Sequence, residues 1–260
     1  MVKIKVKDVT VTYGSIRALE DVTFELKEGE VTGIIGPNGA GKTTLLKTLA
    51  RLLKPVKGVI YINGRNLWSL KPSEKAKIIA YQGPEEPQWS HAKVLDYMLT
   101  ARYPHTRGFM ESYRDIEKIE ESLKIVHALH LANRRLNQLS SGELQRILIA
   151  RLLVQEAKII LVDEPTSHLD LYYQLEILQL LKNITRNKRL VTVITLHDLQ
   201  LASMYCDKLI LLNRGVVEAI GKPDEVLTPE NIAKTYNVEV EVIRHPHGRL
   251  LIIPLKLRKT

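Results

Sequence analysis

The sequence predicts an α/β fold in which antiparallel strands precede a mainly parallel sheet and a helical subdomain is inserted into that sheet. Three observations support this fold. Strand patterns that alternate apolar and polar residues come first, near residues 4–11 and 22–26. Apolar runs then alternate with helical patterns, which is typical of parallel sheets covered by helices. From about residue 83 to residue 155 the apolar spacing is mostly helical, and this stretch interrupts the alternation.

The first buried strand is predicted at residues 31–35, where the apolar run is nearly continuous. A glycine-rich turn follows. After it, apolar residues recur at helical spacing from Leu45 through Leu49 to Leu52 and predict a helix. Residues 58–64 predict a further strand that closes on an Asn-Gly turn.

The later part of the chain repeats the alternation of strands and helices. The predicted strands occupy residues 158–163, 190–195 and 209–213, with a helix over 171–184. Thr228 and Pro229 form a good helix start, with threonine at the N-cap and proline at the first helical position. Residues 238–243 and 250–253 predict a closing β-hairpin.

Composition excludes several classes of protein. With 260 residues, 45% of them hydrophobic and 26% charged, the chain has an ordinary globular balance rather than a disordered or low-complexity one. The single cysteine, Cys206, excludes an intramolecular disulfide framework and a cysteine-cluster metal site. No stretch approaches a membrane span, and the start lacks the apolar region of a signal peptide. We therefore expect an intracellular protein that acts at membranes only through a partner.

The chain is basic, with 38 lysines and arginines against 29 acidic residues and a formal net charge of +9. Such an excess can favour nucleic acids or other anions. Here the basic residues are spread along the chain and form no compact block interleaved with aromatic residues. Nucleic acid is therefore not an expected partner.

A nucleotide-binding motif follows the first buried strand. Residues 36–43, Gly-Pro-Asn-Gly-Ala-Gly-Lys-Thr, fit the P-loop pattern and open a predicted helix, which is the context that this motif requires. Its backbone N–H groups can surround a phosphate, Lys42 can reach the β- and γ-phosphates, and the Thr43 hydroxyl can ligate Mg²⁺. The residues expected at bound ATP are Gly36, Pro37, Asn38, Gly39, Ala40, Gly41, Lys42, Thr43 and Thr44.

Two acidic residues end the apolar run at residues 159–162. Ligands of open α/β sheets bind at the carboxyl ends of the strands, where these side chains would lie. Asp163 is placed to hold Mg²⁺, directly or through water, and Glu164 is placed to polarise an attacking water. The alternative interpretation is that Asp163 and Glu164 are solvated acids that simply end a strand. The P-loop elsewhere in the chain makes this interpretation less favoured.

A third motif distinguishes among P-loop ATPases. Residues 139–146, Leu-Ser-Ser-Gly-Glu-Leu-Gln-Arg, resemble the Leu-Ser-Gly-Gly-Gln signature of the ATP-binding subunits of ABC transporters. Ser140 and the Gly142 backbone can donate to phosphate from the start of a helix. Ser141 and Glu143 depart from the signature, and an acidic Glu143 is less favourable near a γ-phosphate. A serine N-cap on an amphipathic helix is the alternative interpretation.

The resemblance covers nearly the whole chain and implies further site residues. Tyr13 stands where the family stacks an aromatic ring on adenine. Residues 167–170, Ser-His-Leu-Asp, look like the D-loop, so Asp170 is implied near the nucleotide. His197 matches the switch histidine that contacts the γ-phosphate. The family also has a glutamine that touches Mg²⁺ and the attacking water, commonly within the string Tyr-x-x-Gln. This sequence departs from that string.

The sequence reads Ala-Tyr-Gln-Gly-Pro at residues 80–84, so the glutamine follows the tyrosine directly. We assign the catalytic and metal-binding glutamine role to Gln82. A match without gaps would place Pro84, which cannot take this role, at the position of the family glutamine. Gln88 is the alternative to Gln82.

The resemblance also implies an organisation and a mechanism. A RecA-like P-loop NTPase core with the antiparallel strands and a small C-terminal extension would comprise residues 1–82 and 156–260, and the helical signature subdomain would comprise 83–155. Two chains would sandwich two ATP molecules, with the signature of each completing the site of the other. Closure of this homodimer would drive two transmembrane permease subunits from the cytoplasmic face of the membrane, and an extracytoplasmic binding protein would supply the substrate.

Local strings favour one branch of the family. Residues 94–99, the signature, Leu-His-Asp-Leu at 196–199 and residues 221–230 resemble the importer ATPases for iron siderophores, haem and cobalamin, a group that includes molybdate or tungstate importers. Other ABC transporters remain an alternative. A soluble ABC ATPase acting on DNA or ribosomes is less favoured, because those types carry a long coiled coil or two cassettes.

Overall fold

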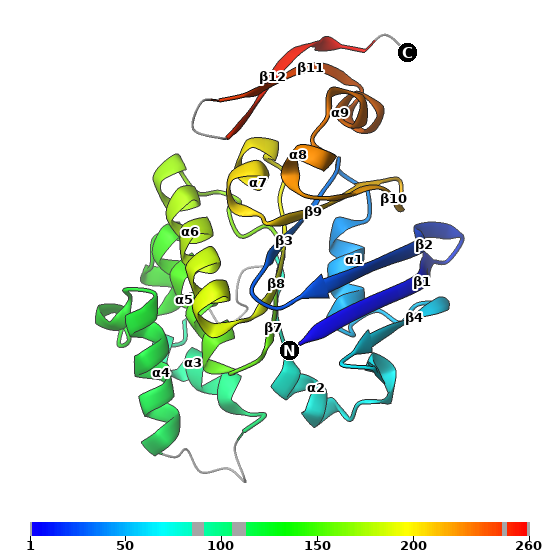
Figure 1. The fold of residues 1–260 in the computed structure, drawn as a ribbon. Coiled ribbons are helices and arrows are strands. Elements are labelled where there is room, and N and C mark those ends of the chain that lie inside the picture. Colours follow the sequence, from blue (N-terminus) through cyan, green and yellow to red (C-terminus); the bar gives the residue numbers. More distant parts are fainter. Residues whose placement is uncertain (1, 85–90, 106–112, 246–248, 259–260) are drawn as a thin grey trace.

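The computed structural model describes residues 2–84, 91–105, 113–245 and 249–258 (Figure 1). Its central sheet has six strands in the order β10-β9-β3-β8-β7-β6. The strands are β3 (Val31–Ile35), β6 (Ile79–Gln82), β7 (Ile159–Val162), β8 (Val191–Thr195), β9 (Lys208–Asn213) and β10 (Val216–Gly221). Neighbours from β9 to β6 are parallel, and β10 is antiparallel to β9. The carboxyl ends of β3, β8, β7 and β6 therefore meet at one edge, which confirms the predicted parallel core.

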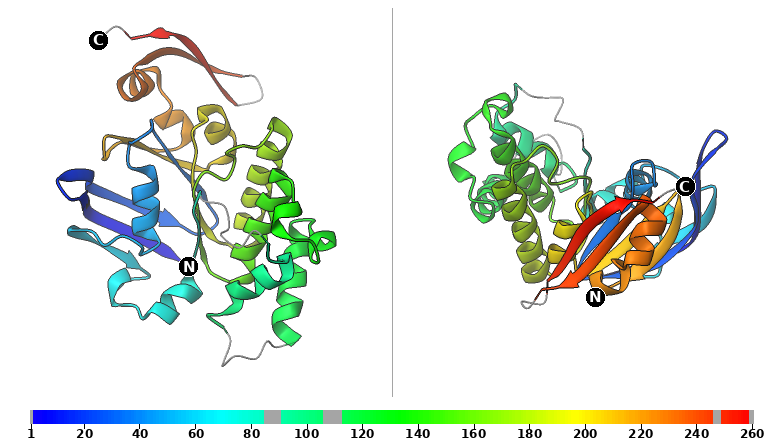
Figure 2. Two further views of the ribbon diagram at one scale, coloured as in Figure 1. Left: turned by 180° about the vertical axis from the view of Figure 1, so that it is seen from behind. Right: turned by 90° about the horizontal axis from the view of Figure 1, so that it is seen from above.

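A second, antiparallel sheet covers one side of the molecule. It is formed by β2 (Ile16–Lys27), β1 (Lys3–Tyr13), β4 (Lys57–Ile62) and β5 (Arg65–Asn66), in that order. Helix α1 (Lys42–Leu49) lies between the two sheets (Figures 1 and 2). Its residues Leu45, Leu46 and Leu49 are fully buried in one apolar cluster with strands of both sheets. Burial of this face, rather than intrinsic propensity, holds so short a helix.

The predicted continuation of this helix through Leu52 is wrong. The helix ends at Leu49, where the N–H of Ala50 closes the last turn on Leu46 and Thr48. Arg51 then adopts a left-handed backbone with φ of 57°, and Leu52 is 54% exposed. The apolar spacing at Leu52 belongs to the turn that follows the helix.

The helical insertion lies between β6 and β7, as the sequence predicts. It contains α3 (Val94–Leu99), α4 (Tyr113–Ile125) and α5 (Ser141–Val154), with short 3-10 turns η2 (Thr100–Arg102), η3 (Leu129–Leu131) and η4 (Leu136–Gln138). The predicted apolar face is present, since Ile119, Leu123 and Val126 are buried. These helices and α6 (Leu171–Lys188) form a group beside the central sheet (Figure 2).

The remaining elements connect or close the core. They are η1 (Leu67–Ser69), α2 (Pro72–Ile78), α7 (Leu199–Tyr205), α8 (Pro223–Val226), α9 (Pro229–Tyr236), β11 (Val238–Arg244) and β12 (Leu250–Leu257). The last two strands form the predicted antiparallel hairpin. Thr228 caps α9 as expected, because its hydroxyl accepts from the N–H of Asn231. No helix within the described ranges is both long and apolar enough to cross a membrane.

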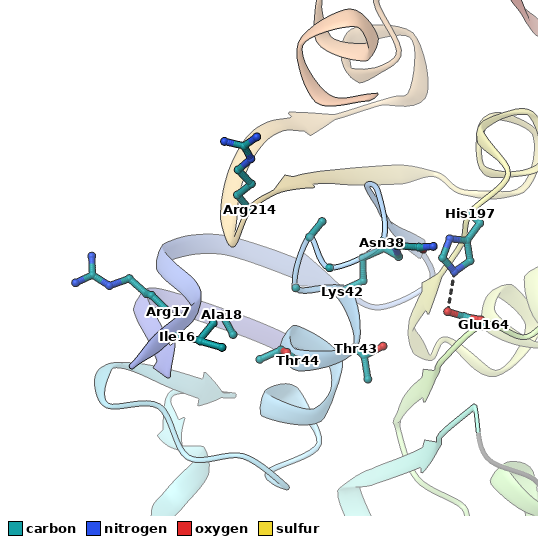
Figure 3. A pocket seen from close by; sticks show the side chains of 13 residues that line it. Ile16, Arg17, Ala18, Asn38, Lys42, Thr43, Thr44, Glu164, His197 and Arg214 are labelled. Atoms are coloured by element: carbon teal, nitrogen blue, oxygen red, sulfur yellow. Dashed lines mark hydrogen bonds and ion pairs between the residues drawn. The ribbon is translucent and has the colours of Figure 1, made fainter. Parts of the chain in front are cut away.

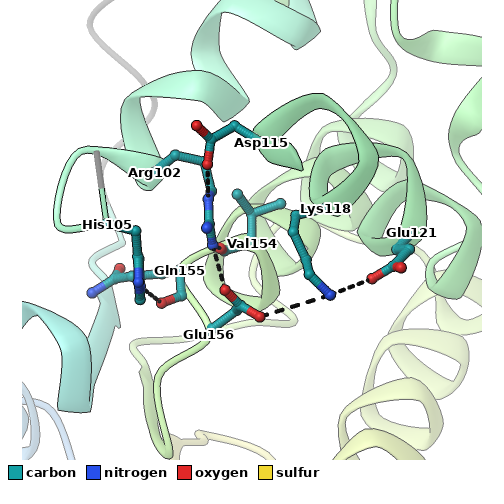
Figure 4. A network of polar contacts seen from close by, with 8 residues as sticks. All are labelled: Arg102, His105, Asp115, Lys118, Glu121, Val154, Gln155 and Glu156. Atoms are coloured by element: carbon teal, nitrogen blue, oxygen red, sulfur yellow. Dashed lines mark hydrogen bonds and ion pairs between the residues drawn. The ribbon is translucent and has the colours of Figure 1, made fainter. Parts of the chain in front are cut away.

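A buried arginine holds the helical insertion together (Figure 4). The Arg102 guanidinium donates from Nε to Asp115 Oδ1 at 2.8 Å, and from Nη1 to the Val154 carbonyl and to Glu156 Oε2, both at 2.7 Å. The Arg102 and Asp115 side chains are only 5% and 7% exposed. One side chain thus joins η2, α4 and the end of α5.

Replacing this arginine should strongly destabilise the protein. We expect Arg102→Met to lower the free energy of unfolding by about 3–5 kcal/mol, because Asp115 and Glu156 would lose the guanidinium charge that faces them. Urea denaturation of the full chain measures this loss. Arg114→Met, at an exposed arginine of α4, is the matched control and should change stability by less than about 0.5 kcal/mol. Equal losses in the two variants would contradict the structural role of Arg102.

Candidate active site

The loop between β3 and α1 leaves the middle of the central sheet and has the conformation of a phosphate-binding loop. Gly36 has φ of 148°, and a Cβ there would lie 2.2 Å from the Leu212 carbonyl oxygen. The backbone can pass this strand only with glycine. Lys42 Nζ donates to the carbonyls of Gly36 at 2.8 Å and Pro37 at 3.0 Å, so its ammonium lies inside the loop.

This loop lines a pocket of about 500 Å³ (Figure 3). The described wall consists of Ile16, Arg17, Ala18, Asn38, Gly39, Ala40, Gly41, Lys42, Thr43, Thr44, Glu164, His197 and Arg214. Helix α1 points its N-terminus here and has no acidic residue in its first turn. Free N–H groups and the positive helix end favour an anion at this place. Burial lowers the pKa of Lys42, and the carboxylates of Glu164 and Asp163 partly oppose that effect.

Asp163 and Glu164 follow β7 and are linked to the end of β8 by one threonine. The Thr195 hydroxyl donates to Asp163 Oδ1 at 2.6 Å and accepts from the Glu164 N–H at 2.8 Å. Glu164 has a left-handed backbone with φ of 51°, which costs conformational energy for a residue with a Cβ. The bond to Thr195 helps to hold this conformation, which presents the Glu164 carboxylate to the pocket.

The Glu164 carboxylate accepts two side-chain hydrogen bonds. His197 Nε2 lies 2.7 Å from its Oε1 (Figure 3). The Ser167 hydroxyl donates to its Oε2 at 2.8 Å. Burial raises the pKa of Glu164, but the hydrogen bonds from His197 and Ser167 and the charge of Lys42 outweigh it and leave the pKa below its ordinary value. The carboxylate is therefore ionised at neutral pH, the form that accepts a proton.

Asp163 has the features of a magnesium ligand. It is 3% exposed, and its Oδ2 has no hydrogen-bond partner within the described residues. A buried carboxylate oxygen without a partner is costly, and a cation would satisfy it. Mg²⁺ prefers oxygen ligands, and the hydroxyl of Thr43 offers a second one in the pocket wall. The donor set thus fits Mg²⁺.

Gln82 ends β6, next to the strand that carries Asp163. Its carbonyl accepts from the Asp163 N–H at 2.9 Å, and its side-chain amide donates to the Gly83 carbonyl at 2.8 Å. Gln82 also lines a smaller cavity, of about 130 Å³, together with Asp163 and Glu164. The alternative residue, Gln88, lies outside the described residues.

The pattern of a P-loop, a following acidic pair and a histidine is found in a family of known proteins. Residues 19–167 match the protein family described as ABC transporter. The chain belongs to the ABC transporter family. It is an ATPase, and the resemblance to the metal-chelate-type importer ATPases that the sequence predicts is confirmed by its relatives.

Three relatives illustrate this similarity. An uncharacterised ABC transporter ATP-binding protein of Methanocaldococcus jannaschii is 40% identical over 252 residues, which cover 97% of this chain and 98% of the relative. A hemin import ATP-binding protein of Gloeobacter violaceus is 40% identical over 247 residues, covering 91% and 88%. The ferric enterobactin transport ATP-binding protein of Escherichia coli is 34% identical over 255 residues, covering 97% and 94%.

Solved structures agree with the fold. An inward-facing metal-chelate type ABC transporter has a chain that superposes with a TM-score of 0.85 at 26% identity, covering 100% of this chain and 99% of that one. A dimeric bacterial ABC transporter cassette superposes with a TM-score of 0.73 at 33% identity, covering 85% and 98%.

A single ABC ATPase chain brings together only part of the predicted site. The described wall of the pocket at the P-loop does not include Ser140, Gly142 and Glu143, which lie at the start of α5, or Asp170, which caps α6. Tyr13 also lies outside this wall and is 48% exposed at the end of β1. The P-loop and these signature residues therefore do not share one pocket in a single chain, although Ser141, Leu144 and Gln145 line the smaller cavity beside Asp163 and Glu164.

Other side chains of this ABC ATPase site were not predicted. The sequence predicted Thr195 only as part of a buried strand and Ser167 only as part of the D-loop, and it assigned neither residue a role in the site. Their bonds to Asp163 and Glu164 depend on how neighbouring strands end side by side. Arg17 and Arg214 line the pocket from β2 and from the turn after β9, and their guanidinium groups point away from the loop (Figure 3). The position of Thr195, a polar residue at the end of an apolar strand, was the feature of the sequence that could have indicated its role.

Proposed function

We propose that this ATPase energises a membrane importer for an iron siderophore, haem, cobalamin or a related metal chelate or oxyanion. The similarity to ferric enterobactin, petrobactin and hemin import ATPases supports this substrate class. One structural observation supports the mechanism: Lys42, Glu164 and His197 line one open pocket, and the described wall of that pocket contains no signature residue of the same chain. Such a half-site needs a second chain.

In this account the P-loop of one chain binds the ATP phosphates. Backbone N–H groups and Lys42 neutralise the phosphate oxygens, and Tyr13 stacks on the adenine. Thr43, Asp163 and Gln82 would hold Mg²⁺, which would add positive charge against the phosphates when bound. The described donors thus stabilise the charge that develops in the transition state.

Glu164 accepts the proton of the attacking water. Its two side-chain partners fix the carboxylate, and its lowered pKa keeps it in the basic form. His197 contacts the γ-phosphate and orients Glu164. Removal of the Ser167 hydroxyl would loosen the carboxylate without removing the base.

The second chain completes the site. Ser140, Gly142, Glu143 and Asp170 of one copy would contact the nucleotide held by the other, so ATP closes a homodimer and hydrolysis reopens it. The helical subdomain, residues 83–155, and the core, residues 1–82 and 156–260, would move together on closure. Two permease subunits would receive this motion at the cytoplasmic face, and an extracytoplasmic binding protein would deliver the substrate.

Affinity purification from detergent-solubilised native membranes tests this proposal. The tagged chain should recover a multi-span permease, identified by mass spectrometry, and the family of that permease would name the substrate class. Recovery of an exporter or of an unrelated importer would reject the metal-chelate assignment. Recovery of only ribosomal or DNA-repair proteins would reject transport as a whole.

Glu143 should weaken dimer closure. The Ser140 N–H lowers the pKa of Glu143, which is therefore ionised at neutral pH and would face the γ-phosphate of the partner's ATP. Glu143→Gln keeps a side chain that can cap α5 but removes the charge. We expect about fivefold less ATP for half-maximal dimerisation, which corresponds to ~1 kcal/mol of removed repulsion.

Light scattering of a hydrolysis-deficient Glu164→Gln background measures this effect as a function of ATP concentration. Glu120→Gln, on α4, is the control and should leave the midpoint unchanged. A higher ATP midpoint in Glu143→Gln would show that the carboxylate supports closure instead.

A further inference from the structure

We propose that Tyr173, Arg146 and Glu176 form a clamp that fixes the start of α6 against the start of α5. The clamp would hold Ser140 and Asp170 as one rigid surface toward the nucleotide of a second chain. These three are positioning residues, since none of them lines the described wall of the pocket at the P-loop. The inference rests on the proposed function, because it concerns the composite site of the dimer.

The ionic half of the clamp is a bidentate pair. Arg146 Nη2 donates to both carboxylate oxygens of Glu176 at 2.7 Å, and Arg146 Nε donates to Oε2 at 3.2 Å. The two side chains are 16% and 28% exposed. Paired donors in a planar fork fix both the distance and the angle between the two helices at this point, which one lysine could not do.

The aromatic half of the clamp lies on the signature glycine. A Cβ at Gly142 would come 2.5 Å from Cδ1 of Tyr173, so the tyrosine ring packs directly on this backbone. The Arg146 guanidinium carbon lies 5.7 Å from the centre of the same ring, within the range of a cation–π contact. Glycine at position 142 therefore permits a close approach of α6 to α5, besides any contact of its N–H with phosphate.

Both helix caps are tied to this clamp. The Asp170 carboxylate accepts from the N–H of Tyr173 at 3.0 Å, and the Ser140 hydroxyl accepts from the N–H of Glu143 at 3.3 Å. Each cap is thus within one helical turn of a clamp contact. Gln174 adds a bond from its side-chain amide to the Leu169 carbonyl at 3.0 Å, which holds the loop before α6. A shift of either helix would move Ser140 relative to Asp170.

The clamp fixes the relative position of the two helix starts and contributes less to the stability of the core. On the buried faces of the two helices, Ile147, Ile177 and Leu181 lie in the apolar core and hold α5 and α6 in the fold. The pair of Arg146 and Glu176 is partly exposed and lies in the second turn of each helix, next to the N-termini that the proposed dimer presents. Its loss should therefore loosen this end while the chain remains folded and its own P-loop remains intact.

The test uses Glu164→Gln as the parent, because it should accumulate the ATP-bound dimer. We expect Arg146→Ala and Glu176→Ala each to raise the dimer dissociation constant at least about tenfold by sedimentation analysis. The affinity of the dilute monomer for ATP, measured by calorimetry, should change less than about twofold. Combining the two substitutions should be no worse than either alone, because they remove the same contact.

Two further variants separate position from folding. Tyr173→Phe keeps the ring and should dimerise like the parent, whereas Tyr173→Ala should weaken the dimer. The charge exchange of Arg146→Glu with Glu176→Arg should restore part of the loss. Unchanged dimerisation in the alanine variants, or an equal loss of monomer ATP affinity, would overturn the clamp while the proposed function stands. A parent that does not dimerise with ATP would reject the proposed function and the clamp with it.

Discussion

Glu164→Gln is expected to bind ATP with near wild-type affinity and to hydrolyse it about 10²–10⁴ times more slowly, the range that a general base contributes. The amide is close in size to the carboxylate and can still bond to His197 and Ser167, so the pocket should keep its shape. It cannot accept the proton of water at neutral pH. Phosphate release under saturating ATP measures turnover, and calorimetry measures binding.

Two further variants separate the loss of the base from other causes of slow turnover. Ser167→Ala leaves the base in place and should lower turnover much less than Glu164→Gln. Glu120→Gln, an exposed carboxylate on α4, should leave turnover unchanged. Turnover close to wild type in Glu164→Gln would remove Glu164 from the catalytic role, and a large loss of ATP affinity would show that its main role is binding.

Lys42→Ala is expected to weaken ATP binding by about 10²–10³-fold, with no measurable turnover at ATP concentrations that saturate the wild type. The ammonium is held inside the loop by the carbonyls of Gly36 and Pro37, where it can reach the phosphates. Without it, the buried part of the loop loses the positive side chain that neutralises them. Calorimetry with ATP and phosphate release measure the two losses.

Lys47→Ala is the matched control, because Lys47 lies on the same helix but outside the described wall of the pocket. It should leave ATP affinity within about twofold of wild type. An equal loss of affinity in the two variants would assign the effect to the stability of α1. Normal ATP binding in Lys42→Ala would contradict the assignment of this pocket to the phosphates.

The core of the fold could be predicted from sequence because burial leaves a direct pattern. The strands β3, β7 and β8 are mostly apolar and have every residue buried, and the P-loop glycines lie between such a strand and a helix. Short elements were missed for the opposite reason. Helix α2 has no buried residue, so no apolar periodicity marks it.

The site was predictable only where a motif carries its own chemistry. Lys42, Asp163 and Glu164 stand in local strings, and the structure brings Lys42 and Glu164 into one pocket wall with His197. Thr195 could not be assigned, since its bonds to Asp163 and Glu164 depend on β8 pairing with β7. The same is true of Arg102, whose acidic partners Asp115 and Glu156 come from distant positions. Gln82 and Tyr13 stay predictions in their assigned roles.

The most direct test of the account is whether catalysis needs two chains. ATPase turnover per chain should be measured across a dilution series with saturating ATP, together with the dimer fraction at each concentration. Because the P-loop pocket of one chain has no signature residue in its described wall, turnover per chain should follow the dimer fraction and vanish where the protein is monomeric. Constant turnover per chain at concentrations where the protein is monomeric would contradict the composite site.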